Sequence, residues 1–228
     1  MSLIIAMLML GIIIMIHEFG HFLFAKLNGI GVIEFSLGMG PRLFSFEKGG
    51  TRYSFKILPF GGSCMMLGED EGITDESAFN NKSVWARISV VAAGPVFNFI
   101  LAFGLSMVLI GITGYDTTRL AGVVDGYPAQ AAGMEAGDVI KSINGRKVHS
   151  YRDINWYLFT HPQKSLKVTW ERTEEGGGTE RFSTELEPVF SAENNQYMMG
   201  VQFNPVPSTA ENIGQLLVHS AYEVQYWI

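Results

Sequence analysis

Two long apolar segments dominate the pattern of hydrophobic and polar residues along this chain. Residues 3–25 contain no charged residue before position 18, and residues 88–112 contain none at all. An α-helix of about twenty apolar residues spans the hydrocarbon core of a bilayer. We therefore predict two transmembrane helices, at about residues 3–27 and 88–112. A cleaved signal peptide is a weaker interpretation of the first segment, because no basic residue precedes it.

The loop between these segments contains apolar residues at a period of two. Tyr53, Phe55 and Ile57 alternate with polar residues, and Gly49 and Gly50 stand just before them. Alternation of this kind is typical of a half-buried β-strand, and paired glycines supply the positive φ angles that a tight turn requires. We therefore predict a β-hairpin over residues 42–62.

After the second apolar segment, the sequence changes to the pattern of a small soluble domain. Short apolar stretches between glycine-containing turns predict strands around residues 121–124, 139–148, 166–170 and 181–186, with a helix over 150–160. We assign residues 115–205 to this α+β domain and residues 206–228, which look helical, to the start of a further transmembrane region. The predicted fold is a membrane α-helical core in residues 1–114, which carries a membrane-associated β-hairpin, followed by the soluble domain.

Charge and composition exclude some partners and suggest an orientation. The net charge is −6 and no basic patch occurs, which argues against a nucleic-acid partner. The single cysteine, Cys64, excludes an intrachain disulfide framework. Basic residues near the ends of the apolar segments are concentrated in the loop between them, at Lys26, Lys82 and Arg87. Because such residues favour the cytoplasmic side of a membrane, we predict that this loop is cytoplasmic and that the region after the second helix lies outside.

The first apolar segment runs directly into His17-Glu18-Phe19-Gly20-His21, the pattern HExxH. On a helix, His17 and His21 lie one turn apart on one face, which suits two nitrogen ligands of one Zn²⁺ ion. Glu18 lies about 100° around the helix, where its carboxylate can polarise a metal-bound water without being a ligand. Ionisable groups inside a membrane are costly and mark functional sites. We therefore predict a zinc site at this position.

Three residues, Gly94, Pro95 and Asn98, interrupt the second apolar segment. Glycine allows two helices to approach closely, and proline removes one backbone donor. Two interpretations of Asn98 are open. Its side chain forms a hydrogen bond between helices, or it faces the same water-lined cavity as His17 and Glu18 and holds the backbone of an extended substrate.

Together these motifs resemble the site-2 protease family of intramembrane zinc metalloproteases, in the branch of the bacterial regulator-of-sigma-E protease. The resemblance rests on HExxH in one span, on Gly94-Pro95-x-x-Asn98 in the next, and on Phe60-Gly61-Gly62 at the end of the hairpin. The soluble region resembles a single PDZ domain. That resemblance rests on Pro128-Ala129, Ala132-Gly133, Gly137-Asp138-Val139-Ile140 and Ile143-Asn144-Gly145.

The resemblance implies an endopeptidase that cleaves transmembrane segments of single-span membrane proteins, such as anti-sigma factors or remnant signal peptides. It implies an upstream site-1-type protease that trims the substrate first. It also implies a multi-pass protein of the bacterial inner membrane, with the PDZ domain on the extracytoplasmic side.

By the same resemblance, His17 and His21 would be the zinc ligands and Glu18 the general base. The substrate-binding residues would be Asn98, Gly94 and Pro95, and the hairpin would clamp the substrate as an added strand. The peptide groove of the PDZ domain would lie near Gly122, Val123 and Val124.

The sequence departs from this family after Phe60-Gly61-Gly62, where it has Ser63-Cys64-Met65 in place of the Tyr-Val-Lys that relatives often carry, and at the metal site. The family's third zinc ligand is an aspartate in a Leu-Asp-Gly motif of a later span, and no such motif occurs here. Asp116 and Asp125 lie on the outer side in the predicted topology and cannot replace it. We therefore expect a chain truncated at its C-terminal end, with the third ligand outside it and little activity alone. The alternative is a non-enzymatic, membrane-anchored PDZ module that binds extracytoplasmic peptide ends.

Overall fold

The two apolar segments form the two longest helices of this computed structural model, α1 (Ser2–Leu27) and α2 (Val84–Thr113). The structure describes residues 2–69, 72–162, 164–174, 176–204 and 206–228. Both helices are long and apolar enough to cross a membrane. Many of their large apolar side chains are exposed, including Leu3 and Ile112. The predicted helices are thus present, and α2 begins four residues before the predicted start at position 88.

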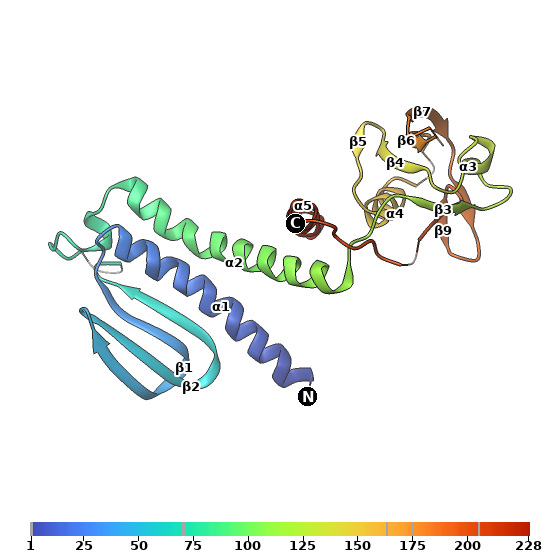
Figure 1. Ribbon diagram of the computed structural model, residues 1–228. Helices are drawn as coiled ribbons and strands as arrows, with labels where there is room; N and C mark the ends of the chain where they lie inside the picture. The colour runs from blue at the N-terminus through green and yellow to red at the C-terminus, as the bar shows by residue number, and fades with distance from the viewer. Residues whose placement is uncertain (1, 70–71, 163, 175, 205) are drawn as a thin grey trace. The chain divides into compact units, whose positions relative to one another are not determined.

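The chain divides into two units, Met1–Leu105 and Ser106–Ile228, which are described separately. In the first unit, α1 lies between α2 and the sheet formed by the two strands that follow it (Figure 1). Small residues bring the two helices together. A Cβ atom at Gly20 would lie 2.5 Å from the carbonyl oxygen of Ala93, so only glycine permits this separation of the two backbones.

The sheet of the first unit consists of β1 (Val32–Lys48) and β2 (Thr51–Met66), which pair as an antiparallel hairpin. The turn is at Gly49 and Gly50, with φ of +59° and +72°, as predicted. The predicted range 42–62 is too short, however, because the strands extend back to Val32 and on to Met66.

The sequence does not reveal the first half of β1, which has strand partners at both of its edges. Leu37 pairs with Phe55 and also with Gly62. Glycines with positive φ at positions 38, 40 and 61 let the strands bend, so that both pairings occur. Burial alternates from Val32 to Gly38, but the buried positions include the polar residues Glu34 and Ser36, so the hydrophobic pattern does not reveal this part of the strand.

A buried carboxylate connects the two halves of β1. Glu34 is 5% exposed and accepts hydrogen bonds from Nε and Nη2 of Arg42, at 3.2 and 2.5 Å. The Nζ atom of Lys56 lies 3.7 Å away. The hydrogen bond from Arg42 is the largest of the effects that lower the pKa of Glu34, from 4.5 to about 2, against the opposing effect of burial.

This pKa predicts that acid weakens the sheet. A carboxylate with a lowered pKa in the folded state stabilises the fold above its unfolded pKa, and this contribution is lost as the pH falls through the folded value. Glu34 therefore contributes fully above pH 4.5 and progressively less towards pH 2. Cys64, the only cysteine in the sequence, is buried in β2. A dithiodipyridine reagent labels the Cys64 thiol at a rate that can be divided by the rate for the unfolded protein at the same pH. This ratio should rise as the pH falls from 6 to 3.

The Glu34→Gln variant should label faster than the wild type at pH 6 and show a flatter pH profile. Glu47→Gln is the matched control, because Glu47 is 68% exposed in its side chain and pairs with Arg52 on the same hairpin. Identical pH profiles for the wild type and Glu34→Gln would show that this ion pair does not hold the sheet closed.

The second unit has the α+β composition that the sequence predicts. Its first elements are β3 (Leu120–Val123), α3 (Pro128–Ala131), β4 (Val139–Ile143), β5 (Arg146–Lys147), α4 (Tyr151–Thr160), β6 (Leu166–Thr173) and β7 (Thr179–Leu186). Four of these strands form one sheet, in the order β5-β4-β6-β7. Its core is apolar and includes Ile140, Ile143, Ile154 and Leu166, each 0% exposed.

Three short strands and a helix complete this unit: β8 (Val189–Ser191), β9 (Gln196–Met198), β10 (Val201–Phe203) and α5 (Ile213–Tyr226). The strand β10 pairs with β3, and β8 pairs with β9. These strands were not predicted, because each is only three residues long. The helix α5 agrees with the helical pattern of the tail, and it is joined to α4 by the ion pair between Glu223 and Arg152.

Candidate metal centre

The two histidines of HExxH face each other on the side of α1 that contacts α2. His17 and His21 are half-buried, and their ring centroids are 4.8 Å apart with an interplanar angle of 80°. The helix therefore places both imidazoles on one face, as their spacing predicts.

Both rings direct Nε2 towards one point on α2. A Cβ atom at Gly94 would lie 2.4 Å from Nε2 of His21 and 2.7 Å from Nε2 of His17. These distances are shorter than any contact that a real Cβ atom makes. Gly94, which is buried, thus leaves open a space that two nitrogen atoms border, and any larger residue would fill it.

The opposite nitrogen of each ring has a partner on α2. Nδ1 of His21 lies 2.8 Å from the carbonyl oxygen of Val90. A carbonyl only accepts, so this Nδ1 carries the hydrogen atom, and in the neutral imidazole the lone pair is then on Nε2. Nδ1 of His17 lies 3.1 Å from the side-chain amide of Asn98. Metal-binding histidines in proteins are oriented by such partners on the second nitrogen.

Glu18 lies beside the sheet. A Cβ atom at Gly62 of β2 would lie 3.3 Å from Cγ of Glu18 and 3.0 Å from the carbonyl oxygen of Ser36. The same stretch of β2 contacts α1 about two turns earlier, where a Cβ atom at Gly11 would lie 2.6 Å from the carbonyl oxygen of Pro59. The carboxylate is therefore adjacent to the backbone of β2, with glycine at the closest point.

The pair of histidines fits a zinc ion as part of a coordination sphere. Two imidazoles whose Nε2 atoms both approach Gly94 are donors of the kind that zinc prefers. Throughout the described parts of the chain, no group of three His, Cys, Asp or Glu side chains is close enough to hold a metal ion. A catalytic zinc has three protein ligands, so these two histidines would be two of the three.

The structure brings together four of the six residues predicted for the core site, namely His17, His21, Gly94 and Asn98, while the Glu18 side chain lies against Gly62 of β2. Pro95 is exposed on α2. The contact partners Val90 and Gly62 were not predicted from the sequence. Val90 acts through its carbonyl oxygen, which every residue possesses. Gly62 belongs to the Phe60-Gly61-Gly62 motif, but its contact with Glu18 joins distant parts of the sequence.

The second unit places Gly122, Val123 and Val124 next to β10. Val123 pairs with Val201 and Gly122 with Gln202, and the N–H of Val124 donates to the carbonyl oxygen of Gly200 at 2.8 Å. A small cavity of about 30 Å³ lies elsewhere, between α4 and the segment that leads into β10. Its lining comprises Asn155, Leu158 and residues 196–201.

Known proteins and one family model match most of the chain. A family model described as Peptidase family M50 matches residues 5–226. A "Putative zinc metalloprotease" of Clostridium acetobutylicum is 38% identical over 200 residues, which are 88% of this chain and 58% of that protein. A protein of the same description from Clostridium perfringens is 36% identical over 217 residues, 94% of this chain and 63% of that protein. The chain therefore spans about 60% of the length of these relatives.

Among solved structures, the PDZ domain of the SdrC-like protein from Listeria monocytogenes is 21% identical to part of this chain. The match covers 39% of this chain and 88% of that domain, with a TM-score of 0.31.

Proposed function

The chain belongs to peptidase family M50, and on this premise we propose that it carries the zinc-binding and general-base residues of an intramembrane endopeptidase. One observation supports the proposal above the others. Nε2 atoms of two histidines converge on a glycine that leaves space between them, and the carboxylate of the same motif stands beside a β-strand. These are the positions that a metal, a water and an extended peptide require.

In the proposed reaction, the three residues of the HExxH motif have separate roles. His17 and His21 hold the metal together with a ligand that the described residues do not include. A zinc ion in such a site lowers the pKa of a water molecule and polarises the carbonyl group that the water attacks. Glu18 accepts the proton of that water and then delivers it to the amide nitrogen as the peptide bond breaks.

We propose that the substrate is an unwound segment of a single-span membrane protein. A helix hides its amide bonds, so it must be extended before hydrolysis. In the described part of the chain, Gly62 and Cys64 of β2 pair with β1 on one side. A substrate strand added to the other side by β-augmentation would begin next to Glu18. Anti-sigma factors and remnant signal peptides, released by a site-1-type protease, have the required architecture.

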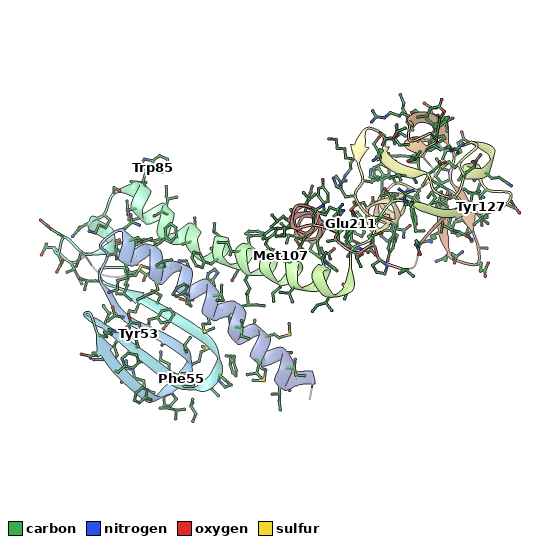
Figure 2. The ribbon with its side chains drawn as sticks, viewed as in Figure 1. Tyr53, Phe55, Trp85, Met107, Tyr127 and Glu211 are labelled. Carbon is green, nitrogen blue, oxygen red and sulfur yellow. The ribbon has the colours of Figure 1, made fainter. Side chains whose placement is uncertain are left out.

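The exposed apolar surface supports a membrane location. Large apolar side chains of α1 and α2 are exposed along their length, and the sheet adds Phe44, Phe55 and Ile57, each at least half exposed. Figure 2 shows Phe55 on the sheet and Trp85 near the start of α2, with the Trp85 side chain projecting away from the helix. We place the protein in the bacterial inner membrane as a multi-pass protein, with the sheet associated with the bilayer.

We propose that the second unit is an extracytoplasmic PDZ domain that screens substrates. Its groove would lie between α4 and the segment 196–201, where the cavity is, and β10 would receive the peptide as a neighbouring strand. This proposal places the groove beside β10, the strand that pairs with the predicted groove residues Gly122 and Val123.

Metal removal tests the proposed function. The protein as its gene encodes it, purified in detergent, should cleave a single-span model substrate, lose this activity in excess phenanthroline, and regain it with added Zn²⁺. Magnesium added instead should not restore cleavage, because imidazole donors select zinc over a hard cation. Undiminished cleavage after complete metal removal would contradict the proposal. Binding of substrate ends without cleavage or zinc would favour the non-enzymatic PDZ module.

A further inference from the structure

We propose that Asn98 is a positioning residue for His17, whose side-chain carbonyl fixes the tautomer in which His17 offers Nε2 to the metal. The inference rests on the proposed function. It assigns to Asn98 a role in metal affinity, which the sequence did not indicate, since both interpretations of Asn98 from the sequence concerned helix packing or the substrate.

The two histidines differ in the partner that α2 offers to Nδ1. His21 has only one possible arrangement, because the carbonyl oxygen of Val90, 2.8 Å from Nδ1, can only accept a hydrogen bond. In the neutral ring, Nε2 of His21 is therefore the nitrogen that is available as a ligand. His17 lacks a backbone carbonyl at the equivalent position and instead has the amide of Asn98, 3.1 Å from Nδ1.

The orientation of the Asn98 amide decides which nitrogen of His17 carries the hydrogen atom. With Nδ2 of Asn98 towards His17, the amide would donate to Nδ1, and the ring hydrogen would then stand on Nε2 and block the ligand position. In this orientation Oδ1 is buried without a hydrogen-bond partner. The two ends of an asparagine amide are nearly identical in shape, and the hydrogen-bond network decides between them.

Turning the amide by half a rotation resolves the problem at His17, and the Nδ2 group then takes the buried position that Oδ1 occupied without a partner. Oδ1 then accepts from Nδ1–H of His17, so the buried acceptor gains its partner and Nε2 gains its lone pair. Both histidines would then have the same arrangement, with a carbonyl oxygen of α2 on Nδ1 and Nε2 at the space beside Gly94. Oδ1 of Asn98 is thus the hydrogen-bond partner of His17.

Zinc affinity distinguishes this role from a contact with the substrate. Partners of metal-bound histidines typically contribute 10–100-fold to metal affinity. We therefore expect Asn98→Leu and Asn98→Ala to raise the zinc dissociation constant of the detergent-purified, gene-encoded protein by about 10–100-fold. Asn98→Asp, which keeps an acceptor on His17, should stay within about threefold of the wild type. The measurement is competition for Zn²⁺ with a chromophoric chelator, and it needs no substrate.

Asn28 provides a matched control. Its Nδ2 donates to the carbonyl oxygen of Phe24 at 2.8 Å and to Oγ of Ser89 at 3.1 Å, so it connects the same two helices without touching either histidine. Asn28→Leu should bind zinc like the wild type. If it weakens binding as much as Asn98→Leu does, the effect comes from helix packing and the proposal is overturned.

The remaining outcomes are also decisive. Equal zinc affinity in the wild type, Asn98→Leu and Asn98→Ala overturns the positioning role while leaving the zinc site intact. An Asn98→Asp variant as weak as Asn98→Ala overturns it as well, because the acceptor then does not matter. A wild type that binds no zinc overturns this inference together with the proposed function, so the two failures are distinguishable.

Discussion

Replacing Glu18 with glutamine is expected to leave zinc binding intact and to slow peptide-bond cleavage by about 10²–10⁴-fold, the usual contribution of a general base. The amide of glutamine has nearly the shape of the carboxylate, so it still fits beside Gly62. It cannot accept a proton from water, however. His17 and His21 keep their contacts with α2, so the ligands are unchanged. The measurement compares zinc content and initial cleavage rate in the same preparation.

Glu47→Gln is a suitable control for the Glu18 variant, because Glu47 is exposed on the hairpin and pairs with Arg52. It makes the same chemical change away from the site and should cleave at the wild-type rate. If Glu18→Gln also cleaves at that rate, another group is the base. If it loses its zinc, Glu18 supports the metal rather than the water.

The second large effect is expected at Gly94. Substituting alanine places a methyl group 2.4 Å from Nε2 of His21 and 2.7 Å from Nε2 of His17, so the rings must move apart or the space between them closes. Either result removes the pair of nitrogen ligands, and we expect Gly94→Ala to lose zinc binding and all cleavage. Zinc content of the purified variant is the direct measurement.

Gly104 on the same helix separates this effect from a change in helix stability. A Cβ atom there meets nothing within 4 Å, and alanine is favoured over glycine inside a helix by about 1 kcal/mol. Gly104→Ala should therefore bind zinc normally. Full zinc binding by Gly94→Ala would show that the metal does not sit where the two Nε2 atoms point.

Much of the architecture was predictable because it depends on patterns that a sequence displays directly. The apolar runs that become α1 and α2 and the i, i+4 spacing of the histidines need no knowledge of distant contacts. The family match over residues 5–226 confirms the resemblance to the site-2 proteases that these motifs indicated. The alternation at Tyr53 and Phe55 likewise predicted a hairpin.

The rest depends on pairings that no local pattern encodes. The double pairing of Leu37 extends the sheet to Val32, and the burial of Glu34 follows from it. The contact between Asn98 and His17 joins residues 81 positions apart, so the sequence left the role of Asn98 open. The partner of His21 is a backbone carbonyl, which every residue possesses, and its place is set only when α1 packs on α2.

The measurement that tests the central claim most directly is X-ray absorption at the zinc edge of the detergent-purified protein. The account predicts one zinc with two imidazole nitrogens at about 2.0–2.1 Å, and loss of that signal when His17 and His21 are both replaced by alanine. A zinc environment that is unchanged in the double variant would contradict it.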